Sequence, residues 1–260
     1  MAAAEIHPSA IVEAGARLAA GVRVGPFCWV GPEVTLAEDV VLDSHVRVDG
    51  RTTLGRGVRV HHGAALGGPP QDLKFRPGTT SSLEVGEGTV VREYVTLNLA
   101  SDEGAVTRVG RHCLLMAYTH VAHNTVVGDH VILANGVQLA GYVTVEDHAI
   151  LGGLVPVHQF VRIGCHAMVG GGYRVPKDVV PYVRAGGCPL RPVGLNLVGL
   201  KRRAFPAATL AALRQAYRLL FRRGLTVAEA VARIHAEVPP CPEVDHFARF
   251  ALASERGLAR

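Results

Sequence analysis

Aliphatic residues return at every sixth position along most of this chain. The pattern runs through residues 6–66, resumes briefly over 85–97, and continues unbroken from 109 to 175. An α-helix turns every 3.6 residues, so a six-residue repeat would be spread around all of its faces. A fixed period of six is instead typical of a parallel β-helix built from hexapeptide repeats.

A second inward-facing position follows four residues after each aliphatic anchor. It holds a small or β-branched residue, as at Cys28, Val34 and Val131. Glycine often comes directly after the anchor, as at Gly25 and Gly110, which suits a corner with no room for a Cβ atom. If three hexads form one triangular coil, residues eighteen apart stack about 4.8 Å from each other along the axis.

Two segments interrupt the repeat. Residues 67–82 contain three prolines, which break strand pairing. This segment is therefore expected to be an excursion from a rigid scaffold, where binding residues are often found. Residues 98–107 form a shorter excursion that keeps the six-residue phase, with Glu103 at the position of an anchor.

Beyond residue 196 the apolar period becomes helical. Gly224 is placed to end one helix, because glycine readily adopts the left-handed conformation that follows a helix. Thr226 with Glu229 forms a capping box at the start of the next helix. A last helix is expected over residues 243–254.

The chain has 260 residues, 48% of them apolar and 19% charged, so it can bury a sizeable core. The patterns divide it into a parallel β-helix over residues 1–190 and a small α-helical domain over 191–260. No run approaches the roughly 18 apolar residues of a membrane span, and the N-terminus has neither a basic flank nor an apolar signal core. We therefore expect a cytoplasmic protein.

The formal net charge of +5 favours anionic partners, such as a phosphorylated substrate or an acidic protein. No stretch interleaves aromatic residues with a basic cluster, so a nucleic-acid partner is not expected. The five cysteines are odd in number and include no CxxC pair, so we interpret them as reduced packing residues.

The six-residue phase distinguishes a few of the thirteen histidines as candidates for a functional site. Three anchors, at positions 121, 139 and 157, are eighteen apart, so their hexads stack on one face. This face carries a polar cluster made of His120, His123, Tyr142, His158 and Gln159. Surface histidines without a task are one alternative interpretation. Another is a Zn²⁺ site in which His120 and His123 join a histidine from a neighbouring chain, although no third ligand lies in phase.

Motifs across nearly the whole chain are similar to those of one protein family. They include Gln-Asp-Leu-Lys-Phe (71–75), Leu-Leu-Met-Ala-Tyr-Thr-His-Val-Ala-His-Asn (114–124), Val-His-Gln-Phe (157–160) and Gly-Leu-Lys-Arg-Arg (199–203). These motifs resemble the UDP-N-acetylglucosamine O-acyltransferase family, which performs the first step of lipid A biosynthesis. The resemblance implies a left-handed parallel β-helix and a homotrimer with active sites between subunits. It implies no cofactor, because the acyl donor is carried on the phosphopantetheine of acyl carrier protein.

The resemblance also assigns roles to residues. His123 would be the general base that takes a proton from the 3-hydroxyl of the sugar, and the backbone N–H of Gly141 would stabilise the oxyanion. Gly171 matches the position that gauges acyl length, where glycine leaves the groove open. The other matches are substrate contacts: Asp72, Lys74, His120, Tyr142, His158, Gln159, Asn196, Arg202 and Arg203.

Some residues depart from the family pattern. Asn124 stands where the family usually has Asp after the base, and Tyr142 stands where it usually has His. Asn98 and Leu99 replace a His-Arg pair, and Val198 replaces a Glu. These departures keep two other functions open: the same chemistry on a 3-amino analogue of the sugar, and a non-catalytic scaffold that binds the sugar nucleotide or the carrier protein. A zinc hydratase is a third alternative, which rests on the zinc interpretation of His120 and His123.

Overall fold

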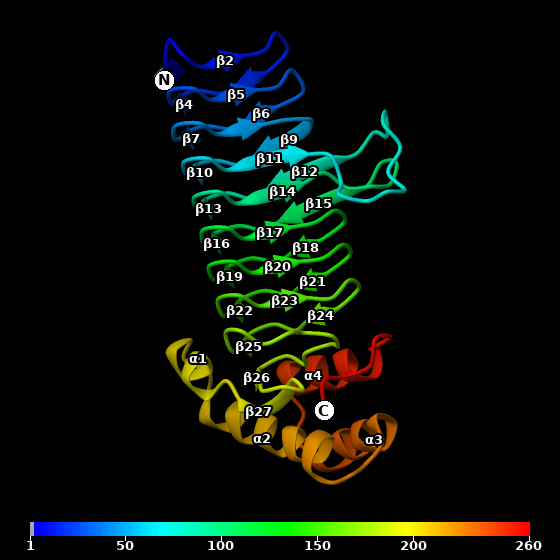
Figure 1. Ribbon diagram of the computed structural model, residues 1–260. Coiled ribbons are helices and arrows are strands. Elements are labelled where there is room, and N and C mark those ends of the chain that lie inside the picture. Colours follow the sequence, from blue (N-terminus) through cyan, green and yellow to red (C-terminus); the bar gives the residue numbers. More distant parts are fainter. Residues whose placement is uncertain (1–2) are drawn as a thin grey trace.

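The computed structural model describes residues 3–260, which form a tall stack of coils that ends in a group of helices (Figure 1). Each coil contributes one short strand to each of three sheets. The first sheet contains β1 (Glu5–Ile6), β4 (Arg23–Val24), β7 (Val41–Leu42), β10 (Arg59–Val60), β13 (Val90–Val91), β16 (Leu114–Leu115), β19 (Ile132–Leu133), β22 (Ile150–Leu151), β25 (Met168–Val169), β26 (Val183–Gly186) and β27 (Arg191–Leu195). The second sheet contains β2 (Ile11–Val12), β5 (Trp29–Val30), β8 (Arg47–Val48), β11 (Ala65–Gly68), β14 (Thr96–Asn98), β17 (His120–Val121), β20 (Gln138–Leu139) and β23 (Pro156–Val157). The third sheet contains β3 (Arg17–Leu18), β6 (Thr35–Leu36), β9 (Arg51–Leu54), β12 (Ser82–Val85), β15 (Val106–Val109), β18 (Val126–Val127), β21 (Thr144–Val145) and β24 (Arg162–Ile163).

Strand register confirms three hexads in each regular coil. Arg23 pairs with Val41 and Gln138 pairs with Pro156, eighteen residues apart in both cases. Pairing between the named strands is parallel until β26 and β27, which run antiparallel and close the last coil. The predicted parallel β-helix is therefore confirmed.

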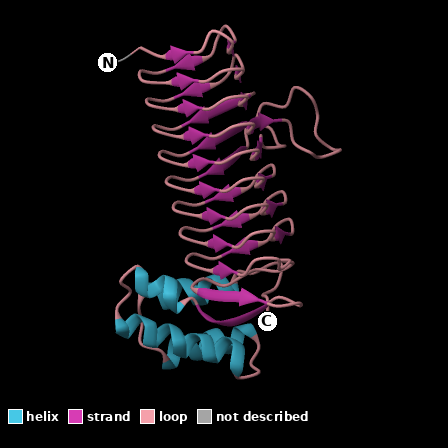
Figure 2. Cartoon of the chain, turned by 60° about the vertical axis from the view of Figure 1, so that its left-hand side comes forward, coloured by secondary structure: helices cyan, strands magenta, loops and turns pink. Residues whose placement is uncertain are grey.

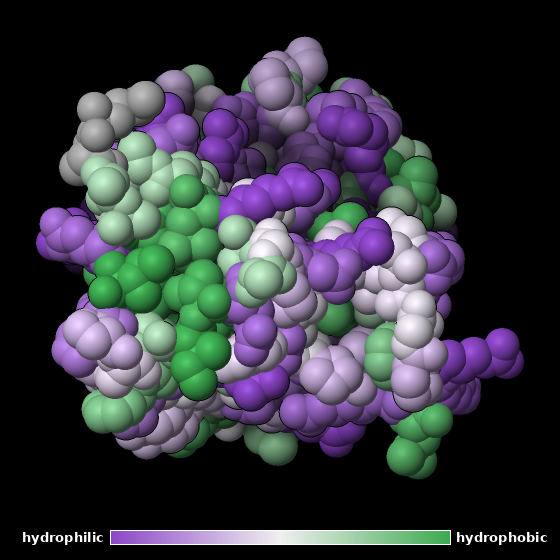
Figure 3. Space-filling view, turned by 90° about the horizontal axis from the view of Figure 1, so that it is seen from above, coloured by the Kyte–Doolittle hydropathy of each residue, from purple (hydrophilic) through white to green (hydrophobic). Residues whose placement is uncertain are grey.

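The aliphatic anchors form the core of the stack. Leu36, Leu115 and Leu139 are at most 1% exposed, and each such side chain contributes about 1.5–3 kcal/mol when it is fully buried. The first coil has no neighbour on its outer side, so Ile6 and Ile11 remain 46% and 57% exposed. The view onto this end of the molecule shows a patch of hydrophobic surface beside hydrophilic surface (Figure 3).

The corners of the coils use two different positions. A Cβ atom on Gly25, directly after its anchor, would lie 2.8 Å from the carbonyl oxygen of Asp43 in the next coil, so the predicted lack of room is confirmed. The left-handed backbone instead falls three residues after the anchor. Phe27, Asn124 and Tyr142 occupy such positions, with φ between 57° and 60°. Their side chains line up along the corners because every coil repeats the same turn.

Both predicted excursions are present. The first leaves the stack between β11 and β12 and projects from its side (Figure 1). The second lies between β14 and β15. Across it, Ser82 of β12 pairs with Val106 of β15, twenty-four residues away instead of eighteen. One extra hexad is therefore inserted, which explains why the six-residue phase survives. Glu103 leaves the core and accepts a hydrogen bond of 2.8 Å from the backbone N–H of Thr80, so the second excursion supports the first.

Helices cover the last coils (Figure 2). They are α1 (Leu197–Arg202), α2 (Ala207–Arg222), α3 (Val227–Glu237) and α4 (Pro242–Leu252). Gly224 has a φ of 67° just after α2, and the capping box of Thr226 and Glu229 opens α3, as predicted. Because β27 still belongs to the first sheet, the helical part begins at Leu197. Within residues 3–260, no helix has the length and apolar character needed to cross a membrane.

Candidate active site

A cavity of about 970 Å³ lies where the excursions meet the second sheet. The first excursion contributes Asp72 and Lys74, and the second contributes Ser101 and Asp102. The coils contribute His120, His123, Gly141, Tyr142 and Gln159. Seven of the residues that the sequence singled out therefore line one cavity. Five of them lie on the coils, where the register of β17, β20 and β23 stacks their hexads.

His123 is held in one orientation by its neighbour in the chain. Its Nδ1 lies 2.9 Å from Oδ1 of Asn124. The same Oδ1 accepts hydrogen bonds of 2.9 Å from both the backbone N–H and the hydroxyl of Ser101. On the other side, Nδ2 of Asn124 donates to Oδ2 of Asp102 over 2.9 Å. A carboxylate oxygen can only accept, so the amide of Asn124 has one possible orientation.

This orientation fixes the tautomer of His123. Since Oδ1 of Asn124 faces the ring and can only accept, Nδ1 of His123 carries the proton. The other ring nitrogen, Nε2, then has a free lone pair. The imidazole is thereby prepared to accept a proton at Nε2.

Gly141 packs directly against this ring. A Cβ atom at Gly141 would lie 2.6 Å from Cε1 and 2.7 Å from Nε2 of His123, so only glycine fits beside the base. Among residues 3–260, no acceptor takes a hydrogen bond from the backbone N–H of Gly141. Gly141, which carries this unpaired N–H donor, therefore lies beside Nε2 of His123. Such a donor suits a negative charge that develops near the base.

Tyr142 and His120 complete the polar wall. The hydroxyl of Tyr142 donates to Oδ2 of Asp102 over 2.8 Å, and its ring meets the ring of His123 edge-on at 5.3 Å. Nδ1 of His120 lies 2.7 Å from the hydroxyl of Thr96. Burial lowers the pKa of His120, and the neighbouring His123 lowers it further, so His120 stays neutral near pH 7.

The first excursion carries its polar residues on a tight turn. A carboxylate oxygen of Asp72 accepts a hydrogen bond of 2.9 Å from the backbone N–H of Lys74, and the carbonyl oxygen of Asp72 accepts one of 3.0 Å from Phe75. The side chain of Lys74 is exposed at the mouth of the cavity. This turn presents one carboxylate and one ammonium group to a ligand.

Five expected residues lie outside this cavity. His158 is half-buried, and its Nδ1 accepts a hydrogen bond of 3.1 Å from Arg256. Asn196 and Arg202 line a second cavity of about 520 Å³ beside α1. Arg203 ends α1. Gly171 is exposed outside both cavities.

Sequence reasoning did not find Ser101 and Asp102. They lie in the second excursion, where the six-residue phase says nothing about which side chains turn toward the coils. The predicted zinc alternative also has no counterpart within one chain. In the described part of the chain, His120 and His123 belong to no group of three potential metal ligands.

Comparison with known proteins agrees with this geometry. Residues 178–259 match the family model described as Udp N-acetylglucosamine O-acyltransferase, domain 2, and residues 107–141 match the model of bacterial transferase hexapeptide repeats. The acyl-[acyl-carrier-protein]–UDP-N-acetylglucosamine O-acyltransferase of Thiobacillus denitrificans is 44% identical over 258 residues, which are 99% of this chain and 100% of that protein. The protein of the same name from Myxococcus xanthus is also 44% identical, with the same coverage of both chains.

Solved structures agree with the fold. LpxA from Acinetobacter baumannii superposes with a TM-score of 0.95 at 40% identity, covering 98% of this chain and 99% of that one. The UDP-N-acetylglucosamine acyltransferase from Bacteroides fragilis gives a TM-score of 0.96 at 34% identity, with the same coverage. The fold is thus a left-handed parallel β-helix with a C-terminal helical part. Since such identity extends over nearly the full length, this chain belongs to the family of acyl-[acyl-carrier-protein]–UDP-N-acetylglucosamine O-acyltransferases.

Proposed function

We propose that this enzyme transfers a 3-hydroxyacyl chain from acyl carrier protein to the 3-hydroxyl of UDP-N-acetylglucosamine, the first step of lipid A biosynthesis. The observation that carries the proposal is the pair formed by the free Nε2 of His123 and the free N–H of Gly141. Acyl transfer to a hydroxyl needs both a proton acceptor and an oxyanion donor at the reacting centre.

The reaction follows from this pair. Nε2 of His123 takes the proton of the sugar hydroxyl while the oxygen attacks the carbonyl carbon of the thioester. Negative charge then develops on the carbonyl oxygen, where the N–H of Gly141 donates to it. Collapse of the tetrahedral intermediate breaks the carbon–sulfur bond, and the leaving sulfur takes the proton from the imidazolium. The thioester itself supplies the activated acyl group, so the proposal includes no cofactor.

Asp102 is proposed to supply the charge that Asn124 lacks. An amide orients the imidazole but carries no negative charge to stabilise the imidazolium. Here the amide joins His123 to the carboxylate of Asp102 through hydrogen bonds of 2.9 Å on each side. Polarisation along such a chain strengthens each bond. Asp102 is thus a positioning residue that acts on the base through Asn124.

A homotrimer is proposed to complete the substrate site. Asp72 and Lys74 lie at the main cavity, whereas Asn196 and Arg202 lie at the second one. Packing the first cavity of one subunit against the second cavity of its neighbour would bring both sets onto one sugar nucleotide. Arg202 and Arg203 are exposed cations that suit a diphosphate or the acidic carrier protein. A nucleotide sugar and a carrier protein are water-soluble substrates, which fits an enzyme of the cytoplasm.

The test is acyl transfer by the purified protein. UDP-N-acetylglucosamine and its 3-amino analogue would be offered separately with 3-hydroxyacyl carrier proteins of several chain lengths. Turnover on UDP-N-acetylglucosamine is expected. Turnover on the amino sugar alone would move the function to amide formation, and binding without turnover on either would leave a non-catalytic scaffold. Light scattering on the same sample tests the homotrimer, and a monomer that turns over at full rate would overturn it.

A further inference from the structure

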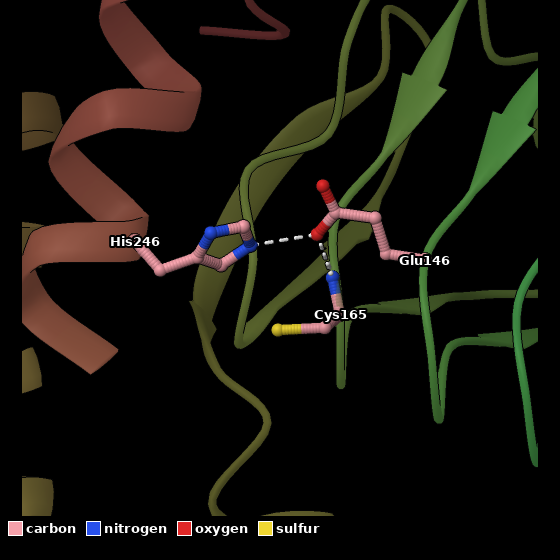
Figure 4. Close-up of side chains that lie close together, drawn as sticks. All are labelled: Glu146, Cys165 and His246. Carbon is pink, nitrogen blue, oxygen red and sulfur yellow. Dashed lines mark hydrogen bonds and ion pairs between the residues drawn. The ribbon is translucent and has the colours of Figure 1, made fainter. Parts of the chain in front are cut away.

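Three side chains with metal-binding atoms converge where α4 meets the last coils. Glu146 follows β21, Cys165 follows β24, and His246 lies in the middle of α4 (Figure 4). One ligand atom from each residue lies within 4.8 Å of the others, and all three residues are half-buried. In the described part of the chain, this is the only such group of three.

We propose that Glu146, Cys165 and His246 bind one Zn²⁺ ion. Carboxylate oxygen, thiolate sulfur and imidazole nitrogen are the three ligand types that zinc takes in proteins. Tetrahedral zinc holds its ligands at about 2.0–2.3 Å, which places the ligand atoms roughly 3.3–3.8 Å from each other. To reach that size, Oε2 of Glu146 and Nε2 of His246, which lie 2.7 Å apart, would separate by roughly 0.6 Å, and ligand atoms as far apart as 4.8 Å would approach each other by about 1 Å. A water molecule would take the fourth position.

The coils hold two of the ligands in place without the metal. The backbone N–H of Cys165 donates to Oε2 of Glu146 over 2.9 Å, so the carboxylate is already oriented next to the thiol. Nε2 of His246 lies 2.7 Å from the same oxygen. Arg162 is the nearby cation, and its Nη2 lies 3.9 Å from the other carboxylate oxygen, Oε1. Arg162 therefore does not occupy Oε2 of Glu146, the oxygen that would bind the zinc ion.

Charge and protons balance at the proposed site. Zinc would displace the thiol proton of Cys165 and the proton shared between Glu146 and His246, and both protons would go to solvent. Two negative ligands and a neutral imidazole then neutralise the ion. The bound ion would replace the hydrogen bond between Glu146 and His246 with coordinate bonds from two ligands on the coils and one on α4.

This site is separate from acyl transfer. None of its three residues lines the main cavity. It joins segments one hundred positions apart in sequence, so its expected role is to hold α4 on the coils. The other contacts here include Arg162, which lies 4.3 Å above the ring of Phe250 and donates to the carbonyl oxygen of Ala253 over 3.2 Å. Just after α4, Ser254 donates to Asp178 over 2.7 Å.

The first experiment titrates untagged, metal-stripped protein with Co²⁺. The expected result is a thiolate-to-cobalt charge-transfer band that saturates at one ion per chain and disappears when Zn²⁺ is added. Zinc is also expected to raise the melting temperature. Absence of the band from the wild-type protein would overturn the proposal and leave a hydrogen-bonded ion pair. This outcome does not depend on any variant folding, nor on acyl transfer.

Variants then assign the ligands. Cys165→Ser and His246→Ala are each expected to weaken zinc binding about 100-fold or more, because even partners of ligands are worth 10–100-fold. Glu146→Gln keeps the shape of the side chain and is expected to weaken binding less. The matched controls are Cys188→Ser and His235→Ala, since both residues are exposed elsewhere. A cobalt band that survives in Cys165→Ser, or that is lost in Cys188→Ser, would place the metal elsewhere.

Discussion

Two corners of the same β-helix carry histidines, and the imidazole rings at these corners have opposite environments. At one corner His123 has a hydrogen-bond partner at Nδ1 and a free Nε2 in a cavity. At another, His112, His130, His148 and His166 stack ring on ring with centroids 4.7 to 5.2 Å apart. Nδ1 of His148 and of His166 is buried without a hydrogen-bond partner among residues 3–260.

The repeat creates both corners, and the surroundings decide what each can do. Regular coils place equivalent residues eighteen apart, so one ring lies above another wherever aromatic side chains occupy the corner. At the second corner His166 lies among other rings with the cation of Arg203 nearby, and burial lowers its pKa to about 4. At the first corner the two excursions add Ser101 and Asp102, which give the ring an orientation and a charge. Histidine becomes a base here because the repeat is interrupted.

His123→Ala tests this contrast most strongly. We expect turnover to fall about 10²–10⁴-fold, because a positioned base contributes that much. Folding should be unchanged, since the ring lies at the cavity and not in the core. His112→Ala, at the exposed end of the stacked corner, is the matched control and should keep wild-type turnover. Near-normal activity of His123→Ala in the carrier-protein assay would remove this residue as the base.

Gly141→Ala tests whether the space beside the base is required. Its methyl group would lie 2.6–2.7 Å from two ring atoms of His123, so the ring must leave its position. We expect a loss of about 10²-fold in kcat, the size of effect seen when one oxyanion donor or its geometry is lost. Gly153→Ala is the control, because its methyl group would meet nothing closer than 3.3 Å. Equal activity in the two variants would contradict the close contact.

Asp102→Asn tests the charge behind Asn124. We expect kcat to fall about 10-fold with little change in KM, because the imidazolium loses a carboxylate that acts across an amide. Glu103→Gln is the control, because it removes a neighbouring charge that does not touch the network. A wild-type kcat in Asp102→Asn, or an equal loss of kcat in Glu103→Gln, would remove Asp102 as a positioning residue for the base.

The fold was readable from the sequence because each hexad repeats the same two inward positions. The register, both excursions, the capping box and the close packing of Gly25 all followed from that repeat and from local chemistry. Stacking of the hexads also predicted that His123, Tyr142 and Gln159 would share a face.

The remaining features depend on contacts between residues that the sequence periodicity does not relate to each other. Asp102 reaches Asn124 from an excursion whose side chains have no phase. His246 reaches Glu146 from one hundred residues away, after the period has changed from six to helical. Asn196 and Arg202 lie at a second cavity, which sequence phase could not relate to the first.

The stacked histidines should make the free energy of unfolding fall at acid pH. The folded-state pKa of His166 is about 4, below the ordinary value of 6.5 that it regains on unfolding, because burial disfavours the charged ring. Stability is therefore complete above about pH 6.5 and is lost as the pH falls toward 4. After a discount for solvent screening we expect a loss of about 1–2 kcal/mol from this residue.

His166→Phe keeps a ring in the stack and removes the titration, so its stability should fall less between pH 7 and pH 4.5 than that of the wild type. Denaturant unfolding at fixed protein concentration measures the difference, with His235→Phe on exposed α3 as the control. Equal losses in His166→Phe and the wild type would mean that folding does not lower the pKa of His166, and the contrast between the two corners would then rest on geometry alone.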